Sequence, residues 1–314
     1  MNASWLVAMQ ARDGSWSDFW TPSGSSNQWV TAYAGASLAR AAPAAHGDAA
    51  RAAWHYLVGV QHEDGGWGYG GAVPSDGDST AWALLLAQRI GVERSVPAVR
   101  ARRFLAGLRR DGGIATYGDA TAIRGYLGAA APADFSGWVQ PHACVTAVAA
   151  QLDGLEAELR DDVLATQQTD GSWCGYWWFE PAYATAMSTV ALTPARSARE
   201  RAAVEAALEW ARRRFARDAG ASAFALALLL TIFARAAPGQ SDACDCAQAL
   251  ERARCGDGSW RGTARLRVPA PQTKDPATIK EWERWWGRGV PFNVYSLDQC
   301  SVFTTATAHD ALAS

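Results

Sequence analysis

The chain has 314 residues, of which 49% are apolar and 19% charged, and its formal net charge is -2. This composition indicates a globular protein with a sizeable core, and the absence of a basic run argues against a nucleic-acid partner. A content of 16 tryptophans is unusually high, and these side chains must either pack in a core or line a pocket.

Targeting signals and a cysteine framework are both missing. The first residues lack the basic start and apolar stretch of a signal peptide, and the longest apolar run, 221–234, is too short to span a membrane. We therefore expect a cytoplasmic protein whose six cysteines are free thiols. Cys244-Asp245-Cys246 lacks CxxC spacing, so no metal site is expected there. The sequence carries no signal for an oligomeric state.

A turn recurs along the chain. The pattern Gln-x-x-Asp-Gly-x-Trp occurs at 10–16, 61–67 and 167–173, with weaker copies at 110–114 and 255–260. A degenerate copy is expected near 218–220. Glycine at such turns takes backbone angles that a side chain would forbid, and we expect the Gln and Trp of each turn to pack against the neighbouring unit.

Two kinds of helical pattern alternate with these turns. Amphipathic segments that bury one face precede them, at 49–61, 96–109, 158–168 and 198–216. Segments that are apolar all round follow them, at 29–39, 80–87, 144–152, 183–192, 222–234 and 302–312. This alternation predicts an all-α fold, an (α/α)6 barrel of six outer and six inner helices forming one domain over 1–314. Strand patterns are absent.

An irregular insertion at about 265–295 breaks the repeat before the last inner helix. It carries four prolines and the tryptophans Trp282, Trp285 and Trp286. A long irregular segment in a compact domain is often a binding loop. Two readings stay open, a cap over a cavity and a peripheral contact with a membrane surface.

The starts of the inner helices can be laid over one another, because five of the six begin with Thr-Ala. Two positions before these starts stand Trp29, Asp78, Cys144, Tyr183, Ser222 and Phe303. Asp78 is the single acid of this layer. It could cap a helix beginning at Thr80, or it could be a protonated acid at the mouth of an apolar cavity. An acid among aromatic rings is costly without a purpose, which favours the second reading.

Two motifs carry a family resemblance. Gly65-Gly66-Trp67 followed by Asp76-Gly77-Asp78-Ser79-Thr80-Ala81 is similar to the G-G-W and D-x-D-D-T-A motifs of the class II terpene cyclases. The stretch 171–177, continued at 183–185, resembles the G-S-W-x-G-x-W and Y-G-T motifs of the triterpene enzymes. The chain therefore resembles the squalene–hopene and diterpene cyclase group.

The resemblance implies a reaction and a set of roles. A buried, neutral carboxylic acid protonates a polyprenyl, prenyl diphosphate or meroterpenoid substrate, and the cation is trapped by neighbouring double bonds. Asp78 would be the proton donor, with Asp76 and Ser79 as its hydrogen-bonding support. No cofactor is implied, and magnesium would matter only if the substrate carried a diphosphate.

Further residues are candidates for the substrate site. The expected lining of the cation is Trp29, Cys144, Trp177, Tyr183 and Phe303, with Trp67 and Trp82 as weaker candidates and core packing as the alternative for each aromatic ring. Glu180 is either the deprotonating base, a second acid or a solvated loop carboxylate. The basic residues Arg261, Arg265, Arg267 and Lys274 either bind a diphosphate or solvate a surface.

The chain also departs from the family pattern. Ser79 replaces the third aspartate of the acid motif, and Val148 stands where the triterpene enzymes have a histidine that assists the acid. His142 could substitute for it or lie in a surface loop. A second barrel domain, usual in the family, is missing, which implies a smaller or differently shaped cavity.

Two rival functions remain. A zinc barrel of the prenyltransferase type would use Asp298-Gln299-Cys300 and a distant histidine, but His309 is about 13 Å along the same helix and cannot close a tetrahedral site. The other rival is a non-catalytic barrel that binds an apolar ligand.

Overall fold

The computed structural model describes residues 3–41, 43–217 and 222–314. Thirteen α-helices lie within these ranges, and the expected all-α fold is confirmed. The degenerate turn expected near 218–220 lies outside the described residues. Seven short strands, which the sequence analysis did not expect, also form. None of the described helices is long and apolar enough to cross a bilayer.

Six helices form the centre of the molecule, and they match the six apolar segments expected from the sequence. They are α2 (Gln28–Ala41), α4 (Gly77–Arg89), α7 (Ala143–Ala149), α9 (Pro181–Ala191), α11 (Ala223–Ala236) and α13 (Val302–Leu312). Each packs against the next in this order, and α13 packs against α2. Their side chains are buried around most of the helix circumference, as apolar composition on every face predicts.

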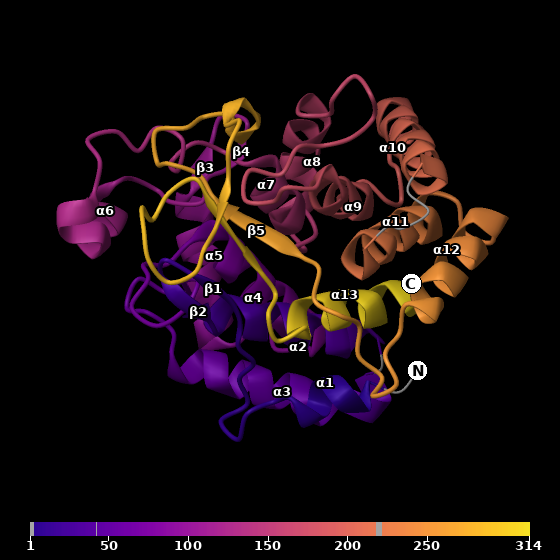
Figure 1. Cartoon of the computed structure of the whole chain (residues 1–314), viewed down its shortest axis with the longest axis horizontal. Helices are drawn as coiled ribbons and strands as arrows, with labels where there is room; N and C mark the ends of the chain where they lie inside the picture. The colour runs from indigo at the N-terminus through magenta and orange to yellow at the C-terminus, as the bar shows by residue number, and fades with distance from the viewer. Residues whose placement is uncertain (1–2, 42, 218–221) are drawn as a thin grey trace.

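A second set of helices packs on the outside of this group (Figure 1). It comprises α1 (Ser4–Ala8), α3 (Pro43–Gly59), α5 (Val96–Gly107), α8 (Glu156–Ala165), α10 (Ala198–Arg217) and α12 (Ser241–Arg252). The short α6 (Thr121–Leu127) stands apart at the left edge of the view and packs against the 3-10 turn η1 (Gly128–Ala130).

The repeated turns join the two sets of helices with the same bonds each time. The indole N–H of each turn tryptophan donates to the carbonyl ten residues earlier, at 2.7–2.8 Å: Trp16 to Leu6, Trp67 to Leu57, Trp173 to Val163 and Trp260 to Leu250. The backbone N–H of the same tryptophan donates to a threonine hydroxyl of the following central helix, namely Thr31, Thr80, Thr185 or Thr305. The Thr-Ala helix starts are therefore anchoring points.

The glutamines of the turns link neighbouring units, as expected. Gln10 donates to Gly14 O of its own turn and to Ala49 O of α3, at 2.8 and 2.9 Å. Gly14 has a φ of +92°, and a Cβ there would lie 2.4 Å from the carbonyl oxygen of Ala52. Glycine is required at this turn both by its backbone angle and by the close approach of α3.

The strands lie at one end of the molecule. β1 (Asp18–Thr21) and β2 (Gly24–Ser26) form a hairpin, and β3 (Arg109–Arg110) and β4 (Gly113–Ile114) form another. In the insertion, β5 (Arg265–Val268) pairs antiparallel with β7 (Val294–Leu297), which pairs parallel with β6 (Glu283–Arg284). These strands are too short for an alternation of apolar and polar residues to be recognised in the sequence.

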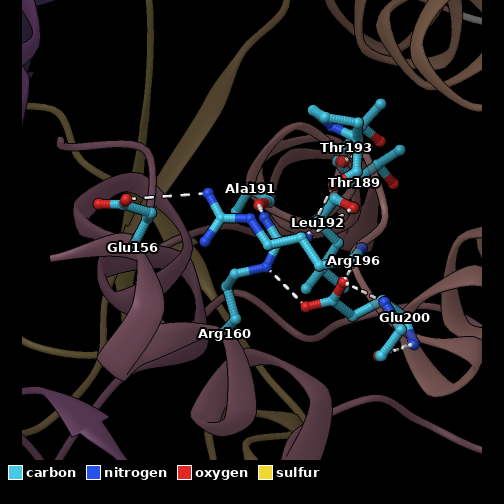
Figure 2. A network of polar contacts seen from close by, with 10 residues as sticks. Glu156, Arg160, Thr189, Ala191, Leu192, Thr193, Arg196 and Glu200 are labelled. Atoms are coloured by element: carbon cyan, nitrogen blue, oxygen red, sulfur yellow. Dashed lines mark hydrogen bonds and ion pairs between the residues drawn. The ribbon is translucent and has the colours of Figure 1, made fainter. Parts of the chain in front are cut away.

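A buried ion pair ties α8 to α10, away from these strands. Arg160 Nε lies 2.6 Å from Glu200 Oε1, and both side chains are 7% exposed. The remaining guanidinium nitrogens donate to the carbonyls of Ala191 and Leu192 at the end of α9 (Figure 2) and to the carbonyl of Pro194. Because every part of the guanidinium is used, this buried charge is compensated.

Candidate active site

A cavity of about 90 Å³ opens at the end of the molecule where the central helices begin. Its walls come from the hairpin β1–β2, the starts of α2 and α4, the segments that precede α4, α7 and α9, helix α6 and strand β5. The lining residues are Thr21, Ser23, Trp29, Tyr69, Val73, Asp76, Asp78, Ser79, Thr116, Tyr117, Ile123, Leu127, Trp138, Trp177, Leu266, Arg267 and Val268. Chain segments far apart in sequence therefore share one apolar space with two carboxylic acids.

The start of α4 differs from the reading in which Asp78 caps a helix beginning at Thr80. The helix begins at Gly77, and Asp76 is its N-cap, accepting hydrogen bonds from the Ser79 N–H and Ser79 hydroxyl at 2.7 Å each. Gly77 makes this possible, because a Cβ there would lie 2.5 Å from the carbonyl oxygen of Ala115. Asp76 and Ser79 thus bind each other, and Asp78 is released from capping.

Asp78 lines the cavity as an acid with an unsatisfied oxygen. Its Oδ1 is buried and has no hydrogen-bond partner in the described part of the chain. Burial raises the pKa of Asp78 well above its usual value, the nearby Asp76 carboxyl raises it further, and the facing Trp29 indole N–H, outside hydrogen-bond geometry, opposes the rise. A carboxyl whose pKa is raised in this way keeps its proton to a higher pH than an exposed one, and this proton can be donated.

Asp76 is the second perturbed acid. Burial raises its pKa to about 7, and the hydrogen bonds from Ser79 limit the rise. The two acids differ in their partners, since Asp76 accepts from the helix start and Asp78 Oδ1 accepts from no described group. Different environments for two carboxyls at one site are typical of acid–base assignments.

Five aromatic rings face the same cavity as Asp78. Two of them, Trp29 and Trp177, were expected from the sequence, and three were missed: Tyr69, Tyr117 and Trp138. The missed rings all lie in linkers between a turn and the next central helix. Because the central helices begin at one end of the molecule, any aromatic residue in these linkers is a candidate for the cavity wall, and this signal could have identified them.

Three expected lining residues are packed inside the helix group and do not line this cavity. Tyr183 and Phe303 are fully buried, and the centroid of Trp178 lies 4.4 Å from that of Tyr183 and 5.3 Å from that of Phe303. Cys144 is buried too, and burial is the main cause that raises its thiol pKa to about 11. Aromatic rings fill the centre of the helix group. The space available for a ligand therefore lies beyond them, at the end of the molecule where the central helices begin. The weaker candidates Trp67 and Trp82 are likewise core residues.

Glu180 lies at a different place from the one expected for a base or second acid. It forms ion pairs with Arg214, at 3.3 Å, and with Arg265, and its side chain is 26% exposed. It does not line the cavity of Asp78. Its position before Pro181 on α9 directs the carboxylate to the basic residues of α10 and β5 instead.

His142 is neither a surface residue nor a hydrogen-bond partner of the acid. Its Nε2 lies 2.9 Å from the carbonyl of Gly137, which can only accept, so Nε2 carries the proton. Nδ1 then accepts from the Thr116 hydroxyl at 2.7 Å, and Thr116 accepts from the Trp177 indole N–H at 2.9 Å. Burial lowers the pKa of His142 to about 3, so the ring stays neutral. This chain of bonds fixes Trp177 at the cavity wall.

The residues considered for zinc have other partners. Asp298 accepts from the N–H groups of Ala264 and Thr304, and its pKa is raised to about 8, chiefly by burial. Cys300 is exposed, and His309 is buried against the Trp260 ring. No group of three potential ligands for a metal ion occurs among the residues described.

Solved structures with this arrangement exist. The type II terpene cyclase MstE from Scytonema superposes with a TM-score of 0.91 at 32% identity, covering 99% of this chain and 95% of that one. The chain belongs to the type II terpene cyclases. A variant of MstE was solved with geranylgeranyl dihydroxybenzoate, described as its substrate, at a TM-score of 0.91 and 32% identity, covering 99% of this chain and 94% of that one.

Two further solved structures are similar to this type II terpene cyclase. A protein from Actinoplanes superposes with a TM-score of 0.91 at 33% identity, covering 98% of this chain and 95% of that one. The ent-copalyl diphosphate synthase from Streptomyces platensis shares the fold, with a TM-score of 0.62 at 22% identity, covering 91% of this chain and 50% of that one. A scan against protein-family models finds no match, and neither does a search of the curated proteins.

Proposed function

We propose that this terpene cyclase protonates the polyprenyl chain of a meroterpenoid and that Asp78 is the proton donor. The observation that supports this is the buried Oδ1 of Asp78, which has no hydrogen-bond partner in the described part of the chain, at an aromatic cavity. The proton passes from Asp78 to a terminal alkene, internal double bonds close the rings, and the final cation loses a proton. Substrate and product are then isomers.

The aromatic wall supports the cationic stages of this reaction. Each ring face stabilises a nearby cation by about 0.5–2 kcal/mol and offers no nucleophile to trap it. Trp29 and Trp177, expected from the sequence, have this role together with Tyr69, Tyr117 and Trp138. Asp76 caps the start of α4. When its carboxyl is protonated, it places no negative charge beside Asp78. Since the reaction starts with a side-chain proton and ends with proton loss, it consumes no cofactor.

The experiment is to incubate the purified protein with geranylgeranyl dihydroxybenzoate, geranylgeranyl diphosphate, farnesyl diphosphate and squalene, and to search for isomeric products by mass spectrometry. We expect a cyclised isomer of the meroterpenoid, formed equally well in the presence of EDTA. Asp78→Asn should abolish turnover while the folded state persists in circular dichroism. Wild-type turnover by Asp78→Asn would refute the assignment.

The arrangement of the helices also belongs to this proposal. We propose that the six central helices are the inner ring and α1, α3, α5, α8, α10 and α12 the outer ring of a single (α/α)6 barrel domain over 1–314. The successive packing of the central helices, with α13 against α2, supports it. Residues of the insertion, Leu266, Arg267 and Val268, line the cavity and so act as part of its cap.

A membrane contact is proposed for the same end of the molecule. Trp286 and Val290 of the insertion are 64% and 71% exposed, and Arg284 lies 4.1 Å over the Trp286 ring. An apolar prenyl substrate partitions into lipid, so a patch of this kind beside the cavity would meet it there. Co-sedimentation with anionic vesicles should fall for Trp286→Ala, and unchanged binding would contradict this contact.

A further inference from the structure

Arg267 is a buried cation in the cavity wall without a carboxylate partner. It lies on β5, is 8% exposed, and forms no ion pair with any described residue. The rings of Phe179 and Trp282 lie 5.6 and 5.5 Å from its guanidinium carbon. Burial lowers its pKa, but a guanidinium remains charged at neutral pH.

A structural role accounts for only part of this side chain. Nε donates to the Tyr176 carbonyl at 2.9 Å and Nη2 to the Gly175 carbonyl at 2.6 Å, which clamps the segment that carries Trp177. Nη1 forms no hydrogen bond in the described part of the chain and is not buried. The clamp therefore leaves Nη1 free for a ligand. Asp275 raises the pKa of Arg267 from outside the cavity lining, but no carboxylate forms an ion pair with it in the described part of the chain.

The neighbouring arginine shows the contrast. Arg265, two positions earlier on the same strand, pairs with Glu180 and does not line the cavity. Arg267 does line it, and it is the one basic residue among the described lining residues. Because Asp76 and Asp78 both have raised pKa values, the charge of this cavity is set by Arg267 below neutral pH.

We propose that Arg267 binds the carboxylate of an acidic head group, so that the substrate is a prenylated acid whose head lies at β5 and whose chain reaches Asp78. This inference rests on the proposed cyclisation. A carboxylate matches a single guanidinium in charge and in its preference for N–H donors. A diphosphate carries more negative charge than one arginine offsets, and no second cation occurs among the described residues of the lining.

The test separates head-group recognition from chemistry. Because we expect Asp78→Asn to prevent turnover, equilibrium binding to this variant can be followed by quenching of the tryptophans that line the cavity. The ligands are geranylgeranyl dihydroxybenzoate, its carboxamide, which has nearly the same shape without the charge, and geranylgeranyl diphosphate. We expect the acid to bind at least about tenfold more tightly than the carboxamide, as expected for a charged hydrogen bond.

A second variant in the same background assigns this preference to one residue. Arg267→Met should remove the advantage of the acid over the carboxamide, whereas Arg265→Met, the matched control, should keep it. Thermal melts show whether the Arg267→Met protein is folded, and the acid–carboxamide comparison with Arg267 intact does not depend on that variant. Equal affinity for acid and carboxamide, or diphosphate binding at least about tenfold more tightly than the acid, would overturn the proposal.

Failure of the cyclisation proposal gives a different result. If wild-type protein converts acid and carboxamide at the same kcat/KM, Asp78 chemistry stands and head-group recognition by Arg267 is wrong. If the acid binds through Arg267 and wild-type protein yields no isomer, recognition stands and the cyclisation proposal fails.

Discussion

Asp76 and Asp78 stand on either side of Gly77 at the start of α4, and only Asp76 accepts hydrogen bonds from the helix. Because Asp76 caps the helix, Asp78 takes no part in capping, and its Oδ1 faces the cavity without a described hydrogen-bond partner. This division explains how two aspartates in one short motif take different chemical roles, and it gives the pH dependence its direction.

We expect kcat to fall as the pH rises through about 7, the raised pKa of Asp76. Ionised Asp76 places a negative charge beside Asp78, which raises the pKa of Asp78 further and makes it a weaker acid. In Asp76→Asn the cap persists, because asparagine is also a good N-cap, and this step should vanish from the pH–rate profile. An unchanged alkaline limb in Asp76→Asn would contradict the coupling.

Stability should follow the same ionisation. The folded-state pKa of Asp76 is raised from 3.8 to about 7, so the folded state holds its proton more tightly than the unfolded state does. The contribution is present below about 3.8 and is lost as the pH rises through about 7. Asp76→Asn should show a smaller loss of Tm over this interval, measured by calorimetry.

The hydrogen bonds that hold Trp177 lead to a prediction about the turnover rate and the distribution of products. Thr116→Val removes both the acceptor for the Trp177 N–H and the donor to His142 while keeping the side-chain shape. We expect kcat to drop by about tenfold, the equivalent of one hydrogen bond, with more incompletely cyclised product. Thr116→Ser keeps the hydroxyl and should behave as wild type in product analysis by mass spectrometry. A wild-type product pattern from Thr116→Val would show that Trp177 is held by packing alone.

Arg160 offers a prediction about stability without effect on chemistry. Arg160→Met leaves Glu200 and three carbonyls without their partner, and we expect a loss of about 3–5 kcal/mol in the free energy of unfolding. The matched control is Arg51→Met, because Arg51 pairs with Asp48 in an exposed i,i+3 contact worth about 0–1 kcal/mol. Denaturant titration of both variants measures the difference, and equal losses would contradict the assigned role of burial.

Glu180→Gln tests the placement of a residue that the sequence suggested as a base. Because Glu180 pairs with Arg214 and Arg265 outside the cavity, we expect kcat to change less than about twofold, and the free energy of unfolding by about 1 kcal/mol or less. A loss of turnover comparable with that of Asp78→Asn, in a steady-state assay, would place Glu180 in the reaction after all.

The sequence predicted the central helices because their signals are local. Runs without charge and the repeated turns locate them, and α13 (Val302–Leu312) forms over the residues expected. Three features depend on distant contacts and were missed. Gly77 joins α4 through its fit against Ala115, Trp178 fills the centre between Tyr183 and Phe303, and Trp138 reaches the cavity from a linker.

The candidate site was predicted in part for the same reason. Asp78 and Trp29 were found because repeated helix starts place them in one layer, and both line the cavity. Arg267 could be named only as one of several scattered basic residues, because its lack of a carboxylate partner appears only once β5 is placed. Unpaired charge is a property of the fold, which a local pattern does not encode.

The cavity of about 90 Å³ is smaller than the roughly 300–1,000 Å³ that small-molecule ligands usually occupy. Part of its wall comes from Ile123 and Leu127 on α6, a short helix that packs against η1 and stands at the left edge of the view (Figure 1). We expect a ligand larger than this space to enter only when α6 moves outward. In stopped-flow experiments, the observed association rate should then level off at high ligand concentration, at the rate constant for the outward movement of α6.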